Sequence, residues 1–349
     1  MRNFTFKGLF LTAVFMLLGC FSIQAADDDL ITKQITINLD KAGTLPNKIA
    51  SSEMYKITNL KIIGEINGTD WNMIREMAGR DNRGYGTEGK LSVLDLSEAK
   101  IVKGGDSYYP GDNCYTSNDE IGEKAFYDCS RLTSLTLPVG ITSIGYDAFA
   151  YCSGLTSLNL PAGITSIGEY AFYGCSGLTS LTLPAGITSI GEYAFSRCSG
   201  LTSLNLPAGI TSIDKYAFSG CSRLTSLTLP AGITSIGEFA FSYCSGLTSI
   251  YVYAEKVPRI GRYAFEGCAS RKCTLYVPKG TYDNYRLSEF GYFENIVEFD
   301  ATGIDKTTTS TDVEEVSRYS LNGQRLAVPV KGLNIVKYSD GSARKVVVK

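Results

Sequence analysis

The chain has 349 residues, of which 44% are apolar, so it can bury a substantial core in two average domains or in one elongated unit. Its formal net charge is −2 and no long run of one charge sign occurs, which argues against the basic surface of a nucleic-acid-binding protein. It contains no histidine, which removes the commonest general base and a common metal ligand.

The N-terminus, residues 1–25, has the pattern of an export signal. Basic residues precede an apolar stretch, Leu9–Leu18, that is too short to span a bilayer. Two processing routes compete: cleavage near Ala25 after small residues, or acylation of Cys20 at the end of the lipoprotein-like run LLGC. The sequence favours cleavage near Ala25, and Cys20 is the candidate lipidation site. Cleavage near Ala25 predicts a soluble exported chain, whereas acylation of Cys20 predicts an exported chain that meets the membrane only through its lipid anchor.

Residues 26–120 are expected to form an N-terminal cap with irregular early repeats. Apolar residues in strand-like spacing predict strands at Ile57–Ile62 and Leu91–Leu96, and the ladder of coils is expected to begin at the first of them. Between these strands, the sequence predicts a helix over residues 70–78 with Thr69 as its N-cap.

The segment 84–90, GYGTEGK, fits the start of a phosphate-binding loop. However, Leu91 stands where such a loop needs the Ser or Thr that binds magnesium. The predicted order is also helix, loop, strand, so no helix N-terminus would face a phosphate. We therefore expect a plain connection here and no cofactor.

A 23-residue repeat dominates the middle of the chain. One unit is Leu155–Gly177, LTSLNLPAGITSIGEYAFYGCSG, and an Ala-Phe pair marks each of seven such units. One cysteine per unit recurs at the repeat spacing, and the last follows after one extra position: Cys129, Cys152, Cys175, Cys198, Cys221, Cys244 and Cys268. This regularity predicts a solenoid in which each repeat is one coil and only stacking of coils completes the burial of apolar side chains.

The apolar positions within the unit predict the shape of the coil. Leu158 and Leu160 are spaced as on one face of a strand, and the following proline ends the strand because it has no N–H to donate. Ile164–Ile167 predicts a second short inward segment, and Ala171–Cys175 predicts one turn of helix. The fold class is therefore a leucine-rich repeat solenoid with 23-residue coils, built of short parallel β-strands plus short helical turns.

The solenoid is expected to cover residues 121–299, of which 282–299 would cap the open end of its core. Residues 300–312, ending in a Thr-rich run, form the predicted linker. In residues 313–349, short strand patterns and Asn-Gly and Asp-Gly turn signals predict a small β-rich C-terminal tail.

The repeat pattern LxxLxLPxxIxxIGxxAFxxC resembles the BspA-like, or Treponema-type, leucine-rich repeat of bacterial surface proteins. The likeness is clean over residues 121–268 and looser over 57–299. It implies surface exposure and adhesive or host-protein-binding roles, and it carries over no catalytic residues. The tail is similar to C-terminal sorting modules of the type IX secretion route, through Lys331–Leu333 and Lys345–Lys349, which implies sorting or anchoring.

The outward positions of the predicted strands are the candidate ligand-facing residues. They should form flat, neutral, hydroxyl-rich rungs that offer hydrogen bonds to a protein or glycan; the alternative is that Ser and Thr merely suit exposed strands. These candidates are Ser157, Asn159, Ser180, Thr182, Ser203, Asn205, Ser226 and Thr228. In five of the units an aromatic residue precedes the Ala-Phe pair, and this row either packs coil to coil or forms an exposed contact strip. This row is Tyr170, Tyr193, Tyr216, Phe239 and Tyr263.

The cysteines at the repeat spacing are expected to be buried free thiols, and neither a disulfide framework nor a metal site. Neighbouring strands about 4.8 Å apart would allow the Cα separation of a disulfide, but side chains on stacked coils point in parallel. A small, soft side chain at a core position explains the recurrence without strain. The pairing of Cys114 and Cys273 stays open.

The sequence thus predicts an exported, non-enzymatic cell-surface protein that binds a protein or glycan partner, in adhesion. The alternative is a structural or assembly component of the cell envelope without a host ligand. A hydrolase with Ser–Lys chemistry is a third hypothesis, and the placement of the serines at repeat positions argues against it.

Overall fold

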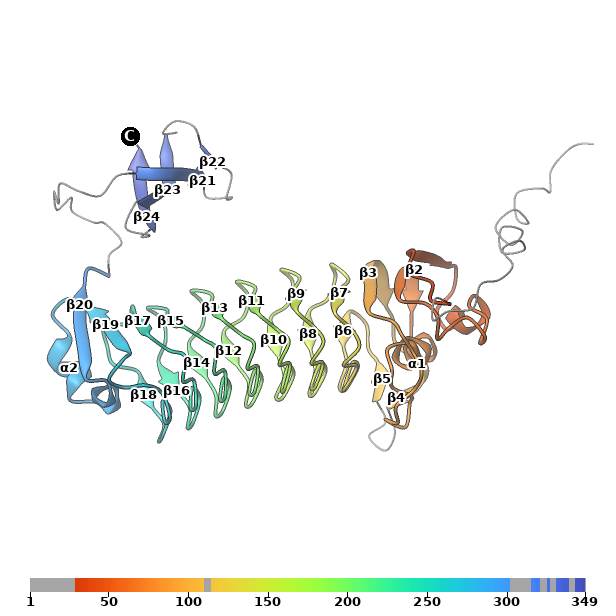
Figure 1. The fold of residues 1–349 in the computed structure, drawn as a ribbon, viewed down its shortest axis with the longest axis horizontal. Coiled ribbons are helices and arrows are strands. Elements are labelled where there is room, and N and C mark those ends of the chain that lie inside the picture. The colour runs from red at the N-terminus through yellow and green to blue at the C-terminus, as the bar shows by residue number, and fades with distance from the viewer. Residues whose placement is uncertain are drawn as a thin grey trace, which may run out of the picture.

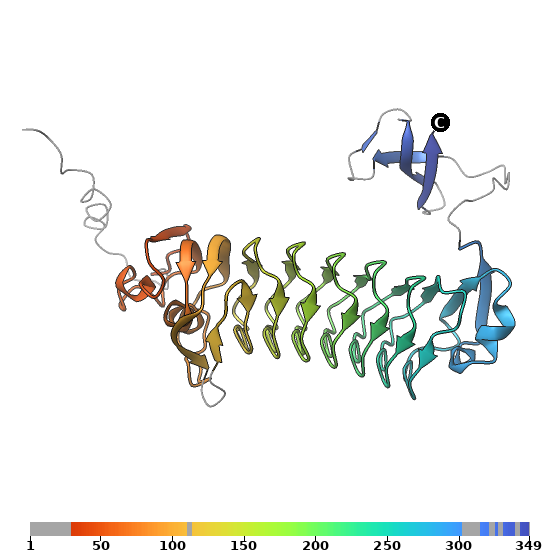
Figure 2. The same cartoon turned by 180° about the vertical axis from the view of Figure 1, so that it is seen from behind.

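The computed structural model describes residues 29–109, 114–301, 315–320, 325–326, 331–338 and 343–348. Residues 29–301 form an elongated solenoid of stacked coils (Figures 1 and 2). The expected export signal, with Cys20 and Ala25, lies outside the described residues, as does most of the predicted linker. Within the described ranges, no helix is both long and apolar enough to cross a membrane.

One side of the solenoid is a parallel sheet to which each coil adds a strand. Neighbouring strands pair in register, so that Leu135, Leu158, Leu181 and Leu204 lie side by side. The strand order is β1-β2-β3-β7-β9-β11-β13, and β15-β17-β19-β20 continues it. The bounds are β1 Ile35–Leu39, β2 Asn59–Ile66, β3 Val93–Ile101, β7 Ser134–Thr136, β9 Ser157–Asn159, β11 Ser180–Thr182, β13 Ser203–Asn205, β15 Ser226–Leu229, β17 Ser249–Val252, β19 Thr274–Pro278 and β20 Asn295–Phe299.

A second side carries shorter parallel strands from the Thr-Ser-Ile segments. They pair in the orders β10-β8-β6 and β12-β14-β16-β18. Their bounds are β6 Glu120–Ile121, β8 Ser143–Ile144, β10 Ser166–Ile167, β12 Ser189–Ile190, β14 Ser212–Ile213, β16 Ser235–Ile236 and β18 Arg259–Ile260. The predicted solenoid of 23-residue coils is confirmed.

The third side is built of hydrogen-bonded turns, and the single helical turn predicted there is wrong. No helix is present between residues 121 and 268, all of which the structure describes. Alternate backbone N–H groups instead donate to the next coil, as Tyr170 N does to Glu192 O at 2.9 Å and Phe172 N to Ala194 O at 2.8 Å. These turns therefore act as a third ladder between coils.

The core repeats with the coil. Each Ala-Phe pair sends its phenylalanine into the interior, where consecutive rings stack with centroids 5.0–5.5 Å apart and planes within 4–11°. These rings are buried together with most leucines and isoleucines of the strands. Each coil's apolar surface is covered by its neighbours, which is why the coils are stable only as a stack.

The N-terminal cap surrounds helix α1 (Gly68–Met77), with the short 3₁₀ helix η1 (Leu45–Asn47) beside it. The predicted Thr69 cap is wrong: Asn67 is the N-cap and forms a capping box with Asp70. Thr69 instead donates its hydroxyl to Asp106 at 2.8 Å. The hairpin β4 (Gly104–Tyr109) and β5 (Cys114–Thr116) follows. The ladder starts at β1, earlier than the predicted start at Ile57.

At the other end, α2 (Tyr282–Arg286), η2 (Glu289–Tyr292) and β20 follow the last coil. Tyr285 Oη donates to the carbonyl oxygen of Ala254 at 2.5 Å, and Phe265 packs against Phe290 and Phe293. The tail is a separate antiparallel sheet in the order β22-β21-β23-β24. Its strands are β21 Glu315–Ser320, β22 Arg325–Leu326, β23 Gly332–Tyr338 and β24 Ala343–Val348.

Candidate functional site

The candidate ligand-facing residues lie together on the long parallel sheet, which we call the strand face. All eight side chains are exposed, and each pair flanks a buried leucine: Leu158, Leu181, Leu204 or Leu227. Strand pairing aligns Ser157, Ser180 and Ser203 in one row and Asn159, Thr182 and Asn205 in the next. The alternation of side chains along each strand therefore places the predicted residues on one surface.

The threonine that precedes each of these strands has a different role, which the sequence did not reveal. Its hydroxyl donates to the threonine carbonyl of the preceding coil, as Thr179 Oγ1 does to Thr156 O at 3.2 Å and Thr202 Oγ1 to Thr179 O at 3.0 Å. By contrast, none of the eight candidate side chains hydrogen-bonds another described residue. Their polar groups are therefore available to a ligand, whereas the threonine hydroxyls already join neighbouring coils.

The strand face ends in aromatic residues that sequence reasoning missed. Strand pairing puts Thr228, Tyr251, Tyr276 and Val297 in one row. The rings of Tyr251 and Tyr276 stack 4.4 Å apart, and Val297 is 46% exposed. The sequence did not reveal this row because the spacing between its residues departs from the 23-residue repeat after the last clean unit. Tyrosines at the end of a polar row are suitable anchors for a partner.

The strand face is uncharged along the clean repeats and is bounded by an ion-pair cluster at its N-terminal end. Lys61 lies 2.6 Å from Glu98 and 3.5 Å from Asp95, on strands β2 and β3. The hydrogen bond to Glu98 raises the pKa of Lys61 above its ordinary value. A ligand that covers the middle of the strand face therefore need not displace this ion-pair cluster.

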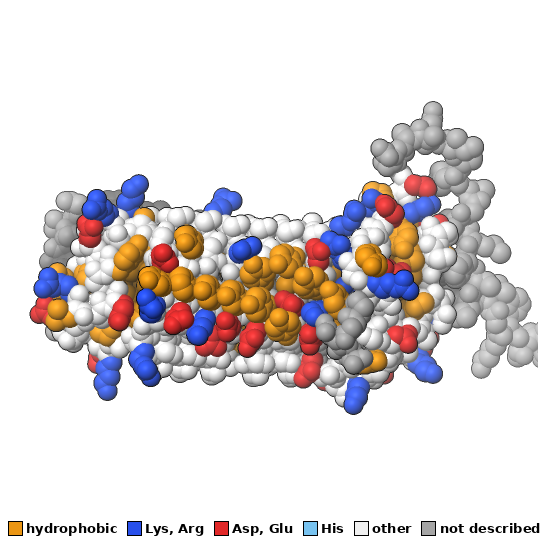
Figure 3. All heavy atoms as spheres, turned by 90° about the horizontal axis from the view of Figure 1, so that it is seen from below, with side chains coloured by type: hydrophobic (Ala, Val, Ile, Leu, Met, Phe, Trp, Pro, Cys, Tyr) orange, Lys and Arg blue, Asp and Glu red, His pale blue; other side chains and the backbone are white. Residues whose placement is uncertain are grey.

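The aromatic row packs coil to coil, as one of the two alternatives left open by the sequence expects. Tyr263 at its end is exposed, whereas the other four rings are half-buried. The rings of Tyr193 and Tyr216 lie 4.5 Å apart within 5° of parallel, and those of Tyr216 and Phe239 lie 4.8 Å apart. Figure 3 shows an orange band of hydrophobic side chains along this side of the solenoid. We call its ring network the aromatic ridge: Tyr109, Tyr127, Tyr146, Tyr151, Tyr170, Tyr173, Tyr193, Tyr216, Phe239 and Tyr263.

Six residues of the aromatic ridge, Tyr151 among them, have left-handed backbone conformations. The other five stand directly before an Ala-Phe pair. The φ angles at this position lie between 53° and 58° in all seven coils, although none of the residues is glycine. Such a conformation costs roughly 1–2 kcal/mol for an L-residue. The inter-coil hydrogen bonds and the ring stacking hold it in place, so the ridge is a rigid feature of the fold.

The cysteines at the repeat spacing are all buried, as predicted, and their thiols make a ladder of their own. Each Sγ from Cys152 onward donates to the phenylalanine carbonyl of the preceding coil, for example Cys152 to Phe126 at 3.0 Å and Cys198 to Phe172 at 3.2 Å. Burial raises the pKa of Cys198 to about 12. A thiol that is protonated and bonded to a carbonyl is a poor metal ligand and nucleophile.

The remaining cysteines lie apart from this ladder. Cys114 begins β5 in the N-terminal cap and Cys273 precedes β19, near opposite ends of the solenoid (Figure 1), so these two residues do not meet within one chain. Both are buried. In the described part of the chain, no group of three or more Cys, Asp or Glu side chains is placed to hold a metal ion.

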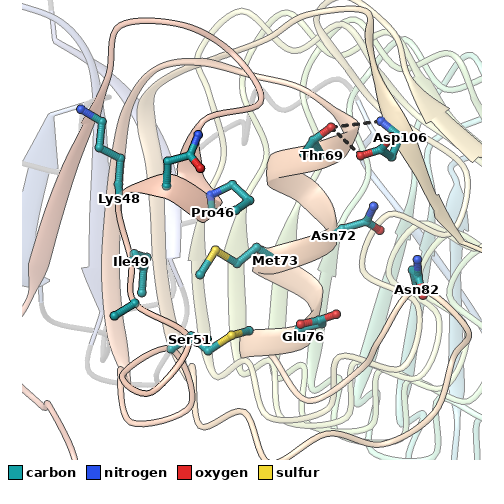
Figure 4. Close-up of a pocket in the computed structure, with 13 residues that line it drawn as sticks. Pro46, Lys48, Ile49, Ser51, Thr69, Asn72, Met73, Glu76, Asn82 and Asp106 are labelled. Carbon is teal, nitrogen blue, oxygen red and sulfur yellow. Dashed lines mark hydrogen bonds between the residues drawn. The ribbon is translucent and has the colours of Figure 1, made fainter.

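The N-terminal cap contains an open cavity of about 650 Å³ between α1 and the 46–54 segment. Met73 points across it toward Ile49, and Asn72 and Glu76 line the helix side (Figure 4). Burial, and then Asp81, raise the pKa of Glu76 above its ordinary value. Among the described contacts, Lys48 pairs with Asp40 at 3.8 Å and makes no bond to Ser51, so the cavity holds no Ser–Lys pair.

The segment 84–90 is the plain connection that its sequence predicted. It lies between α1 and β3, so the helix N-terminus at Asn67 is at the far end of α1 from this loop. Gly86 pairs with Arg80, and Gly84 N donates to Asp81 O at 3.1 Å.

The chain resembles several solved bacterial structures. A leucine-rich repeat protein of T. pallidum is 30% identical, over 42% of this chain and 67% of that chain, with a TM-score of 0.37. One from Bacteroides ovatus is 25% identical, over 53% and 59%, with a TM-score of 0.34. A leucine rich cell surface protein of Faecalibacterium prausnitzii is 24% identical, over 57% and 54%, with a TM-score of 0.37. The chain therefore spans between about half and two thirds of these structures. No curated protein matches it.

The family comparison covers more than half of the chain. The model for the BspA type leucine-rich repeat region matches in six copies, over residues 119–224, 167–290 and 211–325. Proteins built from this repeat are typically non-enzymatic scaffolds for protein interaction. The match extends through the coils whose strand face, cysteine ladder and stacked phenylalanines are described above, and the chain belongs to the BspA-type leucine-rich repeat family.

Proposed function

We propose that the protein is exported to the bacterial cell surface and binds a protein or glycan partner through the strand face, in adhesion. The observation that carries this proposal is the set of eight exposed Ser, Asn and Thr side chains. Strand pairing aligns six of them across three coils, and the other two lie on β15 in the next coil. None of the eight makes a side-chain hydrogen bond to another described residue.

The physical properties of the strand face support a binding role. Its side chains are short and project from strands that are paired on both edges, so little conformational entropy is lost when a partner orders them. Each rung offers donors and acceptors, and the tyrosines Tyr251 and Tyr276 add apolar contact area at one end. The clean repeats contribute no charged side chain to these rungs, so no ion must be desolvated on binding.

A matched pair of substitutions tests the face. Ser180 and Ser189 belong to the same coil and are both exposed, but Ser180 lies on the strand face and Ser189 on the second sheet. We expect Ser180→Lys to weaken saturable binding to a panel of host matrix proteins and glycans by about tenfold or more, because it places a bulky charge in the contact. Ser189→Lys should leave binding unchanged.

The absence of saturable binding by the folded chain to every member of the panel would count against the proposal, as would equal losses from both substitutions. If the chain instead pulls down only envelope proteins of the producing cell, that result would favour the second candidate, a structural or assembly role.

Export and anchoring are part of the same proposal and have their own tests. N-terminal sequencing of the mature protein distinguishes cleavage near Ala25 from acylation at Cys20. Deletion of residues 313–349 should leave the protein inside the cell envelope if the tail is a sorting signal. Surface display that is unaffected by this deletion would remove the sorting role from the proposal.

A further inference from the structure

The aromatic ridge exposes more apolar surface than an isolated solenoid needs. Tyr146 is 40% exposed, Tyr151 42% and Tyr263 51%, and Tyr243, in the same turn segments, is 59% exposed. At roughly 100 Å² for each of these side chains, they alone present about 400 Å². Patches of this size on a soluble chain mark interaction surfaces.

The geometry of the rings limits what can bind there. Tyr193 has one face against Tyr170 at 4.6 Å and the other against Tyr216 at 4.5 Å. A sugar ring or a nucleobase would need an uncovered face on which to stack, and the central rings offer only edges and phenol hydroxyls. Charged groups border the ring row: Glu192 precedes Tyr193, and Arg197 lies over the ring of Tyr173 at 5.4 Å. Exposed Tyr and Arg together are typical of protein interfaces.

The spacing of the ridge favours a partner with the same repeat. Ring centroids recur every 4.5–4.8 Å from Tyr170 to Phe239, which is the spacing of the coils. A contact made by one coil can therefore be repeated by the next only if the partner has the same period. A second copy of this chain meets that requirement.

We propose that two copies of this chain associate in parallel through the aromatic ridge, about a twofold axis that runs along the solenoid. This axis places Glu192 of each copy opposite Arg197 of the other. The contact is isologous and closes as a dimer.

The contact is modest in size. Including the partly exposed rings, about 600 Å² per copy becomes buried, or about 1,200 Å² in total, at the lower limit of specific interfaces. The dimer should therefore dissociate on dilution. Both strand faces stay open, so the dimer would present two binding surfaces to a multivalent partner.

Sedimentation velocity of the full chain across a wide concentration series tests the inference. We expect a dimer that dissociates on dilution. Glu192→Arg and Arg197→Glu should each weaken it by about tenfold or more, since each places like charges opposite one another twice. The double variant should restore it, because the pair is merely exchanged. Arg223→Glu, at an exposed site outside the ridge, is the charge-matched control.

Circular dichroism checks that every variant is folded. A monomer at all concentrations would overturn the inference, as would a dimer unaffected by either single reversal or one that the double variant fails to restore. The inference does not rest on the proposed ligand: Ser180→Lys should leave the dimer intact, so the two proposals fail separately.

Discussion

Trp71 donates from its indole Nε1 to the carbonyl oxygen of Ala125 at 2.8 Å, and this bond joins the helix of the N-terminal cap to the first clean coil. The indole is 1% exposed and packs against Phe126 with ring centroids 5.1 Å apart. The phenylalanine stack of the core thus continues into the cap without a break. Arg75 donates to the same carbonyl at 3.1 Å.

We predict that Trp71→Phe lowers the free energy of unfolding by about 1–2 kcal/mol, because a hydrogen bond is lost and a small cavity is left. The cost stays moderate since Arg75 still satisfies the Ala125 carbonyl. Urea denaturation followed by circular dichroism measures it. An unchanged transition midpoint would show that the cap does not stabilise the solenoid through this contact.

Because the backbone of Tyr193 is left-handed, we expect an unusual order of stability among substitutions at this position. Its φ is 55°, and its ring stacks on both neighbours. Tyr193→Phe should be within about 0.5 kcal/mol of the parent, since it keeps the stack. Tyr193→Ala should cost about 1–3 kcal/mol through two lost ring contacts. Tyr193→Gly should be more stable than Tyr193→Ala by about 1 kcal/mol, because glycine adopts this backbone without strain.

Equilibrium denaturation of the three Tyr193 variants measures this order. An alanine variant more stable than the glycine variant would mean that the positive φ carries no strain in this fold.

We predict that the carboxyl group of Asp147 makes the free energy of unfolding depend on pH. Burial raises its pKa to about 6, against 3.8 for the ordinary side chain, while Lys124 lowers it and Glu123 raises it. The folded protein therefore holds this proton more tightly than the unfolded chain does. The stability from this group is fully present below pH 3.8 and is lost as the pH rises through about 6.

Asp147→Asn should remove this contribution, so the difference between parent and variant stability should change between pH 4 and 6.5 and stay constant above that range. Denaturation midpoints across this range measure the difference. A difference that does not vary with pH would show that the carboxyl titrates normally.

We predict that the thiols of the cysteine ladder are buried and reduced, and not joined in disulfides. Burial raises the pKa of Cys129 to about 11 and that of Cys198 to about 12. Native protein should therefore leave the ladder thiols unalkylated, whereas denatured protein without reductant should have all of them alkylated. Mass spectrometry counts the modified residues. Thiols from Cys152 to Cys244 that react only after reduction would show that the coils are disulfide-linked.

The sequence predicts most of this architecture because each coil repeats the same local rules. The proline after each strand and the inward leucines fix the strands, and the periodicity places the eight polar candidates on one face. The Ala171–Cys175 spacing predicts a helical turn, but inter-coil bonds from alternate N–H groups take its place. A local pattern cannot show that competition, because the acceptors lie in the next coil.

The same limit explains the other differences. Thr69 has the side chain of a good helix cap, yet Asn67 takes that role because Asp70 completes the capping box and also binds Gly43 and Leu45 from a distant segment. The row that joins Thr228 to Tyr251 and Tyr276 depends on pairing across irregular spacings. Long-range contacts decide these positions, and no single repeat contains them.

Site-specific photocrosslinking tests the central claim, that the strand face is where the partner binds. A photoreactive residue replaces Ser203 on β13 or Ser212 on β14, two positions of one coil on different sides of the solenoid. The chain is then exposed to host matrix proteins and glycans and irradiated. We predict that the bound partner is captured from position 203 and not from position 212. Capture from 212 alone, or equally from both, would contradict the account.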